Sequence, residues 1–557
     1  MLPLNIDEIK LLFDIKVFLG FTLTGLINAV LMLAISYKPM QIMQQCSYKG
    51  KEYFKWLARK DNAHLTRLCM LSLLSIFGFL LTNMALSFID RSWVKYAGFL
   101  VYFLFLAIYF KGELSRKEKV PLVLTRRMVR LMITYAFLII IFSLILIYGV
   151  NLLAIPFRKN LLANFRYAIL CLCPMAVPFL LLIAYYINEP FEKRNNLKYV
   201  KNCKLKLQSA DGLIKIGITG SYGKTTVKEI LKTLLSEKYN VLSTPASYNT
   251  PLGICKTVKH LTPSHDVFIA EMGARRVGDI KELTEIVNPT IAVITGITSQ
   301  HLETFKLFEN VKKTKYELIE NMNGGKAVFN ADNKFTREFF NDCTFEKRLA
   351  GIDKSAKPYV YASDIEINSQ GSTFTLHVGK KSQKVTTTLL GNHNVSNICM
   401  AVAVADYLGL TIGEICAGIS RVKPIEHRLQ LISSQNGITI LDDSYNANPE
   451  GVKCALDTLK QFSGKKIVVT PGIVEIGIHE NEQNFSFGLH LSKVADYVIL
   501  VGRGRTLRIR EGLLFGEFNT DNIIMANSLD DAKNKLSSIA TSGDVVLFEN
   551  DLPDKYN

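Results

Sequence analysis

A glycine-rich turn that carries a lysine and two threonines is the stretch of this chain best suited to chemistry. It reads Gly220-Ser221-Tyr222-Gly223-Lys224-Thr225-Thr226, follows a β-branched stretch at Ile214 to Thr219 and precedes a helical stretch at Val227 to Ser236. Glycines let backbone N–H groups and a helix N-terminus face a phosphate, a lysine adds positive charge, and a threonine hydroxyl can hold Mg2+. The turn therefore predicts a nucleotide-phosphate site made of Gly220, Ser221, Gly223, Lys224, Thr225 and Thr226.

The match is to a short variant of the general phosphate-loop pattern, because Ile218 stands where that pattern has another glycine. A glycine-rich turn between a strand and a helix can also be merely structural. The Lys-Thr-Thr that follows the glycines favours phosphate binding.

A carboxylate at the end of a second strand could complete a metal site. Glu271 closes the stretch Val267 to Glu271, and carboxylate oxygens suit Mg2+. The alternative is a solvated acid at a strand end. Lys224 and Glu271 are therefore the first two candidates for catalytic residues.

The elements around these residues alternate between short β-branched strands and helical stretches. Strands are expected at Ile214 to Thr219, Val267 to Glu271, Ile291 to Thr295 and Ala327 to Asn330. This alternation predicts an α/β domain with a mostly parallel sheet covered by helices. Shorter, polar-alternating strands at Asp364 to Thr388 predict an antiparallel flap.

A second, Rossmann-like α/β unit is expected to begin near Ile438. Its predicted strands are Ile438 to Leu441, Lys466 to Thr470, Tyr497 to Val501 and Val545 to Phe548.

The first part of the chain is of another kind, with long apolar runs close to the roughly 20 residues that cross a bilayer. They lie at Phe13 to Ser36, Leu68 to Ile89, Val94 to Phe110, Leu131 to Ile155 and Tyr167 to Ile187. About five transmembrane helices are predicted. The alternative, buried helices of a soluble domain, would require successive uncharged runs to overfill one core.

Charge supports a membrane interpretation and orients it. The chain is 48% hydrophobic yet carries a formal charge of +17, and much of the excess Lys and Arg borders the apolar runs. Basic residues are concentrated after the first, third and fifth runs, which places the N-terminus outside and everything after Pro190 in the cytoplasm. No basic and aromatic patch predicts nucleic-acid binding.

Ten scattered cysteines lack the paired spacings of a disulfide framework or zinc site, which suits a reducing compartment. No cleavable signal peptide is predicted. Three domains follow: a membrane domain at residues 1–190, an ATP-binding domain at 191–425 and a C-terminal domain at 426–557.

A series of further motifs resembles the Mur ligase family, over roughly Leu213 to Val546. The phosphate loop looks like the ATP loop of those enzymes, and the other motifs follow in the family's order. They are Asn249 to Gly253, Glu271-Met272-Gly273, Thr298 to Glu303, Lys315-Tyr316-Glu317, Asn330-Ala331-Asp332, Gly391-Asn392-His393-Asn394 with Asn397, Arg428-Leu429, and Asp442-Asp443-Ser444-Tyr445-Asn446-Ala447-Asn448-Pro449. The last motif resembles the MurF-like branch, which adds D-alanyl-D-alanine, more than its sister branches.

The resemblance implies roles for individual residues. Lys315 matches a lysine that family members carboxylate with carbon dioxide, and His301 would support a second Mg2+, so that Thr225, Glu271, His301 and Lys315 form the metal set. An isolated surface histidine and a solvated helix lysine are the alternatives. Asp332, Asn394, Asn397, Arg428 and Asp443 resemble ATP contacts, and Arg428 is also a catalytic candidate. Asn249, Thr250, Tyr445 and Asn446 are the substrate-binding candidates.

The implied reaction activates a carboxylate with ATP and Mg2+. The carboxylate attacks the γ-phosphate, an acyl phosphate and ADP form, and an amine then displaces phosphate. No serine or cysteine nucleophile is needed. Closure of the C-terminal domain would exclude water from the acyl phosphate.

Two departures from the MurF-like pattern affect the substrates. Membrane runs stand where soluble relatives hold the uridine nucleotide, so a lipid-linked acceptor becomes a candidate beside a UDP-linked one. The chain end reads Glu549-Asn550-Asp551 where MurF-like chains tend to have a basic Lys-Gly-Ser element, which puts the D-alanyl-D-alanine donor in doubt.

Three hypotheses remain open. The first is a membrane-anchored ligase that adds an amino acid or short peptide to a carboxylated envelope precursor, of peptidoglycan or of another surface polymer. The second is the same chemistry on the standard UDP-linked peptidoglycan precursor. The third is a P-loop ATPase coupled to transport, or an inactive binding module.

Overall fold

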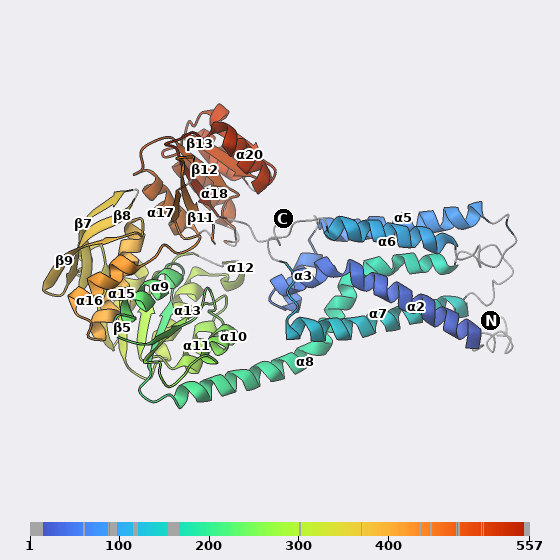
Figure 1. Ribbon diagram of the computed structural model, residues 1–557, viewed down its shortest axis with the longest axis horizontal. Coiled ribbons are helices and arrows are strands. Elements are labelled where there is room, and N and C mark those ends of the chain that lie inside the picture. The colour runs from blue at the N-terminus through green and yellow to red at the C-terminus, as the bar shows by residue number, and fades with distance from the viewer. Residues whose placement is uncertain are drawn as a thin grey trace. The chain divides into compact units, whose positions relative to one another are not determined.

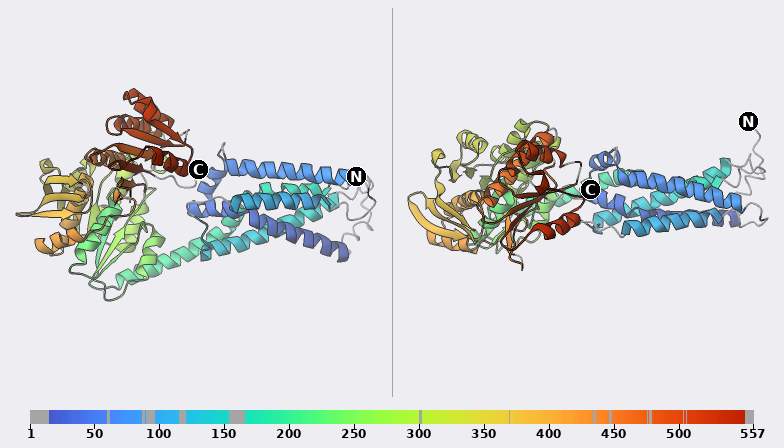
Figure 2. Two further views of the ribbon diagram at one scale, coloured as in Figure 1. Left: turned by 45° about the horizontal axis from the view of Figure 1, so that its top comes forward. Right: turned by 90° about the horizontal axis from the view of Figure 1, so that it is seen from above.

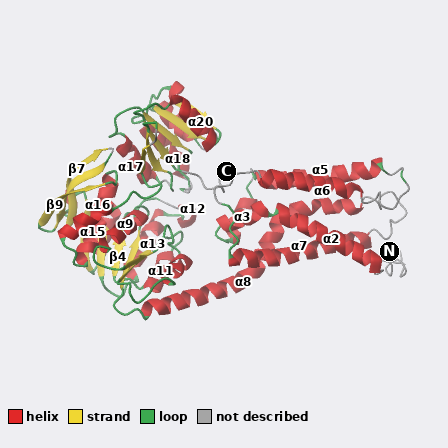
Figure 3. Cartoon of the chain, in the orientation of Figure 1, coloured by secondary structure: helices red, strands yellow, loops and turns green. Residues whose placement is uncertain are grey.

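The structure is a computed structural model that separates into two compact units, one within residues 1–195 and one within 196–552. It describes residues 15–59, 62–86, 89, 97–114, 121–153, 166–299, 302–368, 370–433, 436–445, 448–474, 476, 479–502, 504 and 506–550. Figure 3 distinguishes the all-helical first unit from the second, which contains both helices and strands.

The first unit is a bundle of long helices that lie side by side (Figures 1 and 2). Its described helices are α2 (Ile15–Ile35), α3 (Tyr37–Gln45), α4 (Gly50–Leu57), α5 (Ala63–Ala85), α6 (Ala97–Leu114), α7 (Arg126–Leu153), the 3-10 helix η4 (Arg166–Leu172) and α8 (Cys173–Gln208). Their inner faces share one apolar core, whereas large apolar side chains such as Phe77, Leu100 and Ile145 are exposed on the outside.

Three described helical segments are long and apolar enough to cross a membrane: Ala63–Ala85, Arg126–Gly149 and Ala168–Gln208. A fourth is counted if Thr22–Ile35 and Tyr37–Gln45, which are bent by 47°, form one span. The helix α6, in the run expected at Val94 to Phe110, is not among them. Five spans therefore stay a prediction.

The predicted domain border at Pro190 falls inside a continuous helix. Both Pro178 and Pro190 lie within α8, and the two compact units divide after Asn195. Interior proline removes one backbone hydrogen bond, but the Glu, Lys and Leu residues that follow are good helix formers and carry the helix on to Gln208.

The ATP-binding part of the second unit is built on a sheet of nine strands in the order β2-β3-β1-β4-β5-β6-β7-β8-β9. These are β1 (Ile214–Thr219), β2 (Val241–Ser243), β3 (Val267–Glu271), β4 (Ile291–Ile294), β5 (Lys326–Asn330), β6 (Glu346–Gly351), β7 (Val360–Asn368), β8 (Gly371–Val378) and β9 (Lys381–Thr387). Strands β1 to β7 pair in parallel, and β8 pairs antiparallel with both β7 and β9, so the parallel sheet and its antiparallel flap are both confirmed.

Two helical layers cover this sheet. One core joins the sheet to α9 (Lys224–Leu235), α15 (Asn392–Tyr407) and α16 (Ile412–Arg421). The other joins it to the end of α8 and to α10 (Pro251–Val258), α11 (Asp279–Val287), α13 (Phe308–Glu320) and α14 (Lys334–Asp342), with short helices at α12 (Leu302–Phe305) and η5 (Lys354–Ala356). Strand β1, which leads into the glycine-rich turn, therefore lies inside the sheet with helices on both faces.

The C-terminal part has a six-stranded sheet in the order β10-β11-β15-β12-β13-β14. Its strands are β10 (Gln430–Ser433), β11 (Thr439–Asp443), β12 (Lys466–Thr470), β13 (Tyr497–Val501), β14 (Ile523–Ala526) and β15 (Val545–Glu549). All are parallel except β10. On one face of the sheet, the core includes α17 (Pro449–Leu459), α18 (Glu480–Leu491) and α19 (Leu507–Phe515). On the other face, the core includes α20 (Leu529–Ile539). The short helix η7 (Thr520–Asn522) precedes β14.

Candidate functional site

The turn from β1 into α9 is shaped by two glycines that no other residue could replace without strain. Gly220 has φ +153° and Gly223 has φ +77°. A Cβ on Gly220 would lie 2.1 Å from Thr295 Oγ1, and a Cβ on Gly223 would lie 2.8 Å from Asn397 Oδ1. The turn is therefore held against β4 and α15 with its backbone free to curl around an anion.

Lys224 is folded back over this turn. Its Nζ donates to the carbonyl oxygens of Gly220 at 2.7 Å and of Ser221 at 3.3 Å. Burial lowers the pKa of Lys224 to about 8; Glu271 partly offsets this effect and Arg428 adds to it. A phosphate would replace the two carbonyl acceptors and favour the charged amine.

The remaining predicted loop residues take three different places. Ser221 donates its hydroxyl to Thr298 O at 3.1 Å, which ties the turn to the segment after β4. Thr225 donates its hydroxyl to Glu271 Oε2 at 3.0 Å. Thr226 is buried in the first turn of α9.

Glu271 is the centre of a buried polar cluster at the end of β3. Besides Thr225, its carboxylate accepts from Lys228 Nζ at 3.2 Å and from Asn249 Nδ2 at 3.1 Å. Lys228 is fully buried and also donates to Ala246 O. Lys228 escaped the sequence analysis, although it lies one helical turn after Lys224 and thus on the same face of α9.

The donor set beside the turn fits Mg2+. Thr225 and Glu271 bring a hydroxyl and a carboxylate oxygen together, and Mg2+ is usually held by one or two carboxylates together with substrate phosphates and water. No cluster of three His, Cys, Asp or Glu side chains occurs among the described residues. His301, predicted for a second metal, lies outside the described residues.

Lys315 is buried on α13, with 3% of its surface exposed. Burial lowers the pKa of Lys315 well below its ordinary value and the charge of Lys224 adds to this effect, whereas Asp279 and Glu317 oppose it. Glu317 accepts from the backbone N–H of Gly278 at 2.7 Å and of Lys281 at 2.9 Å, so it caps α11. Lys315 thus sits within electrostatic reach of the phosphate-loop lysine, in a place that favours its neutral amine.

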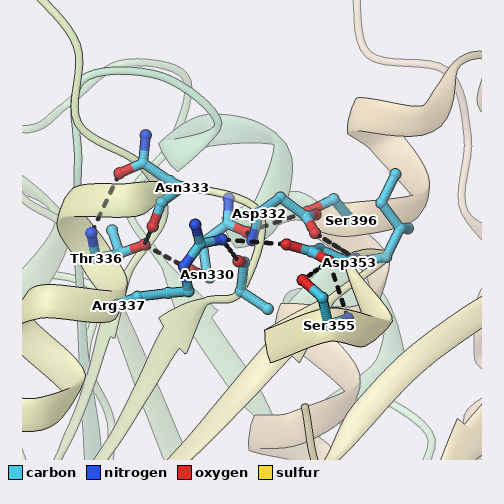
Figure 4. A network of polar contacts seen from close by, with 10 residues as sticks. Asn330, Asp332, Asn333, Thr336, Arg337, Asp353, Ser355 and Ser396 are labelled. Carbon is cyan, nitrogen blue, oxygen red and sulfur yellow. Dashed lines mark hydrogen bonds and ion pairs between the residues drawn. The ribbon is translucent and has the colours of Figure 1, made fainter. Parts of the chain in front are cut away.

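Asp332 lies in a polar network after β5, shown in Figure 4. Its Oδ1 accepts from the backbone N–H of Ile352 at 2.8 Å and of Asp353 at 2.7 Å. Its Oδ2 is buried and finds no hydrogen-bond partner in the part of the chain that the structure describes. Asn330, in the same network, donates to Thr295 O at 2.6 Å and so ties this network to the strand beside the turn.

The start of α15 places Asn394 and Asn397 at the turn. Asn394 Nδ2 donates to Leu390 O at 2.8 Å, and Asn397 Nδ2 is 3.4 Å from Asn394 Oδ1. The close approach of Asn397 to Gly223 brings this pair to the phosphate loop.

The C-terminal part contributes Arg428 and Asp443. The guanidinium of Arg428 lies 4.4 Å from the centre of the Tyr445 ring. Asp443 Oδ1 accepts from the backbone N–H of Leu429 at 3.0 Å. Burial raises the pKa of Asp443 to about 6, while the charge of Arg428 opposes this effect. Asn446 lies outside the described residues.

Two of the substrate-binding candidates have structural duties. The amide of Asn249 donates to Glu271. Thr250 is the N-cap of α10 and accepts from the backbone N–H of Gly253 at 3.3 Å. Tyr445, by contrast, is exposed, and its ring lies against the guanidinium of Arg428.

Comparison with known proteins identifies the family. Residues 218–405 match the model of the Mur ligase middle domain, and residues 427–549 match that of the Mur ligase, glutamate ligase domain. Together these two models account for more than half of the chain. This chain belongs to the Mur ligase family. Members of this family are ATP-dependent acid–amino acid ligases.

Sequence comparison with individual Mur ligases shows that this chain is similar to enzymes of the MurF branch. It is 31% identical to UDP-N-acetylmuramoyl-tripeptide–D-alanyl-D-alanine ligase of Escherichia coli (strain K12) over 52% of this chain and 64% of that one. It is 28% identical to the enzyme of the same name from Bacillus subtilis (strain 168), over 60% of this chain and 72% of that one. The chain spans only 57% of the length of the Buchnera aphidicola relative.

Solved Mur ligase structures agree with this placement. MurF from Acinetobacter baumannii aligns with a TM-score of 0.58 at 26% identity, covering 64% of this chain and 77% of that one. MurF from Thermotoga maritima in complex with ADP aligns with a TM-score of 0.57 at 26% identity, covering 64% of this chain and 80% of that one. The MurF-like resemblance of the sequence is therefore confirmed.

Within this Mur ligase, one further functional candidate was missed by sequence reasoning. Glu549, the last residue of β15, is fully buried and lies beside Asp443 in the sheet register. The sequence drew attention to the acidic chain end but could not show that its first carboxyl group faces inward.

Proposed function

We propose that this Mur ligase is a membrane-anchored, ATP-dependent ligase that joins a carboxylate of a cell-envelope precursor to an amino acid or short peptide. The observation that carries the proposal is the convergence of Lys224, Thr225 with Glu271, and Lys315 on one phosphate-binding turn. Phosphoryl transfer to a carboxylate requires groups that stabilise the charge of the phosphates. A lysine, a bound metal and a further charged group beside them would do so.

In the proposed reaction, each group of residues has its own role. The turn N–H groups and Lys224 hold the ATP phosphates, while Asp332, Asn394 and Asn397 are placed for the rest of the nucleotide. Thr225 and Glu271 would hold Mg2+, which supplies electrostatic stabilisation of the transferring phosphoryl group. The acceptor carboxylate attacks the γ-phosphorus as the bond to ADP breaks. The donor amine then attacks the acyl carbon, loses a proton, and phosphate leaves.

Lys315 is suited to be carboxylated. Its buried position beside Lys224 favours the neutral amine, which is the form that attacks carbon dioxide. Nζ of the neutral amine bonds to the carbon and loses a proton, so that the side chain becomes an anionic carbamate. That anion would offset the charge of Lys224 and support a second metal together with His301.

The apolar N-terminal unit supports an acceptor presented at a membrane. Its described helices include three segments apolar and long enough to span a bilayer. Both family models begin after this unit, at residue 218 and beyond. We therefore propose a multi-pass protein of the bacterial inner membrane with its ligase domains in the cytoplasm, acting on a lipid-linked or UDP-linked precursor.

A second candidate is the reaction for which the relatives are named, addition of D-alanyl-D-alanine to UDP-N-acetylmuramoyl-tripeptide. The 31% identity to the Escherichia coli enzyme of that name favours it. The acidic chain end at Glu549 weighs against this donor.

The test is release of ADP by full-length protein in lipid nanodiscs, with amino acids and dipeptides as donors and with UDP-linked or lipid-linked precursors as acceptors. We expect release that depends on both partners. Release that no donor and acceptor pair stimulates would count against a ligase.

The role of Lys315 is tested by Lys315→Ala against Lys313→Ala, which removes an exposed lysine from the same helix. Loss of support for a metal typically costs about 10- to 100-fold, so we expect at least that loss for Lys315→Ala and none for the control. Full activity of Lys315→Ala would disprove the carbamate.

A further inference from the structure

Three arginines stand at the end of α7 where a helix least favours them. Arg126 and Arg127 are the first two residues of α7, Arg130 follows one turn later, and the first turn contains no acid. The backbone dipole of a helix is positive at its N-terminus, so cations there are unfavourable unless negative charge lies beside them. These three arginines form what we call the α7 cluster.

The carboxylates beside the α7 cluster do not balance its charge. Glu192 of α8 is buried, accepts from Arg130 Nε at 2.6 Å and lies 3.8 Å from Arg127 Nε. Glu189, one turn earlier on α8, is already paired with Lys193 at 2.9 Å. Among the described residues, the three arginines thus have one carboxylate as an ion-pair partner, and two positive charges remain uncompensated.

A strained segment between α3 and α4 fixes the position of the α7 cluster. Ser47 and Tyr48 have φ +54° and +53°, in the left-handed region that a bulky side chain rarely adopts. In this conformation the Tyr48 ring has its centre 4.3 Å from the guanidinium carbon of Arg127. Its hydroxyl lies 3.1 Å from Thr125 Oγ1, directly before α7. Backbone strain of this kind occurs where a site needs a fixed geometry.

An open hollow and an exposed apolar segment adjoin the arginines. The hollow has a volume of about 230 Å3 and lies between Tyr48, Arg127 and residues of α8. Val123 and Leu124, just before α7, are 56% and 65% exposed. Gln44 of α3 holds this segment through the backbone carbonyl and N–H of Val123, at 2.8 and 2.9 Å. Exposed apolar side chains beside arginines suit a bilayer boundary, where acyl chains meet phosphate groups.

The α7 cluster also lies at the membrane face on which the ligase domains are proposed to work. It begins the apolar segment Arg126–Gly149, at the end that the bias of basic residues predicts to be cytoplasmic. The guanidinium group presents a planar fork of N–H donors that matches phosphate oxygens. A phosphate held there would be within the cytoplasmic leaflet, where a lipid carries its headgroup.

We propose that the α7 cluster binds the phosphate group by which the acceptor is attached to a lipid. Between the lipid-linked and UDP-linked precursors, this selects the lipid-linked one. The inference rests on the proposed function of a membrane-anchored ligase. A soluble nucleotide would have no use for the exposed Val123 and Leu124 beside the arginines.

The experiment compares dioleoyl phosphatidic acid with dioleoylglycerol, which has the same acyl chains but no phosphate. Binding of each to the full-length protein in a non-ionic detergent is measured by native mass spectrometry. We expect the native protein to bind phosphatidic acid at least about tenfold more tightly, because contacts between arginine and phosphate are charge-assisted. The double variant Arg126→Gln with Arg127→Gln should bring the two affinities close together.

Arg194→Gln is the matched control. It removes an exposed arginine from α8, two positions after Glu192 and thus on another face of that helix. The preference for phosphatidic acid should be unchanged in this variant.

Equal binding of the two lipids by the native protein overturns the inference. So does a preference that survives in the double variant, or one that Arg194→Gln lowers as much. UDP or inorganic phosphate that displaces phosphatidic acid at equal concentration would assign the cluster to a soluble phosphate and overturn it too. If the double variant does not fold, the comparison of lipids and the competition in native protein decide the point.

Failure of the ligase proposal gives a different pattern. A preference for phosphatidic acid without acceptor-dependent ADP release would sink the ligase while the lipid-phosphate site stands. Ligation to a UDP-linked acceptor by a native protein that shows no preference between the lipids would sink the lipid-phosphate site while the ligase stands.

Discussion

Replacement of Gly223 by alanine tests whether the phosphate turn is shaped as described. At φ +77° a side chain costs about 1–2 kcal/mol, because the left-handed conformation brings Cβ close to the following carbonyl. The new methyl group would also lie 2.8 Å from Asn397 Oδ1, and such overpacking typically costs a further 1–3 kcal/mol or so. Relief of this crowding requires the turn or the start of α15 to move, and both are proposed to bind the nucleotide.

Gly212 provides the matched control. It has φ +76°, and no atom lies within 4 Å of the position of an added Cβ. Gly212→Ala should therefore show the backbone cost alone. We expect a larger fall in melting temperature for Gly223→Ala than for Gly212→Ala, and a loss of ADP affinity of at least about tenfold in the former only, equal to about 1.4 kcal/mol.

The assays are thermal unfolding and titration with a fluorescent ADP on the intact protein in detergent. Equal melting temperatures for the two variants, together with native ADP affinity of Gly223→Ala, would refute the proximity of α15 to the turn. Asn397→Ala combined with Gly223→Ala should recover part of the stability, because the added methyl group then has space.

Three other outcomes follow from the same structure. Lys228→Met breaks a buried ion pair with Glu271 and should cost about 3–5 kcal/mol of stability, seen as a large drop in melting temperature. The control, Lys232→Met on the exposed face of α9, should leave the melting temperature unchanged. Equal melting temperatures of the two variants would disprove the buried pair. Because the pKa of Lys224 is lowered to about 8, only about a tenth of the free protein carries the charged amine at pH 9. The affinity for MgATP should therefore fall about tenfold from pH 7 to pH 9 in the native protein. In Lys224→Met the affinity should not change over this range. The apolar N-terminal unit predicts that the protein resists extraction from membranes by alkaline carbonate and is released by detergent; release by carbonate would contradict a spanning domain.

Local chemistry was readable from the sequence, whereas partnerships across the fold were not. Gly220, Gly223 and Lys224 lie within one turn, so the phosphate-binding role predicted for them rests on spacing alone. Lys228 could be assigned only when the fold brought it to Glu271, 43 residues along the chain. The inward direction of Glu549 likewise depends on the register of β15 with β11.

The helices and strands, likewise, could be predicted from the sequence only in part. Alternating polar residues at 364–388 correctly predicted an antiparallel flap, because a period of two marks a half-buried strand. Strands β2, β6, β10 and β14 were not predicted; all but β6 have only three or four residues, which carry too little pattern. The end of the last apolar run suggested a border near residue 190, and the helix-forming residues after it continue α8 past that point.

The origin of the oxygen in the released phosphate tests the central claim most directly. A ligase moves the γ-phosphoryl group to a carboxylate and releases it with an oxygen from that carboxylate, whereas a transport ATPase transfers it to water. Turnover would be run in 18O-water with a donor and an unlabelled carboxylated precursor, and the phosphate analysed by mass spectrometry. We predict phosphate without solvent oxygen; one solvent oxygen in each phosphate would contradict carboxylate activation.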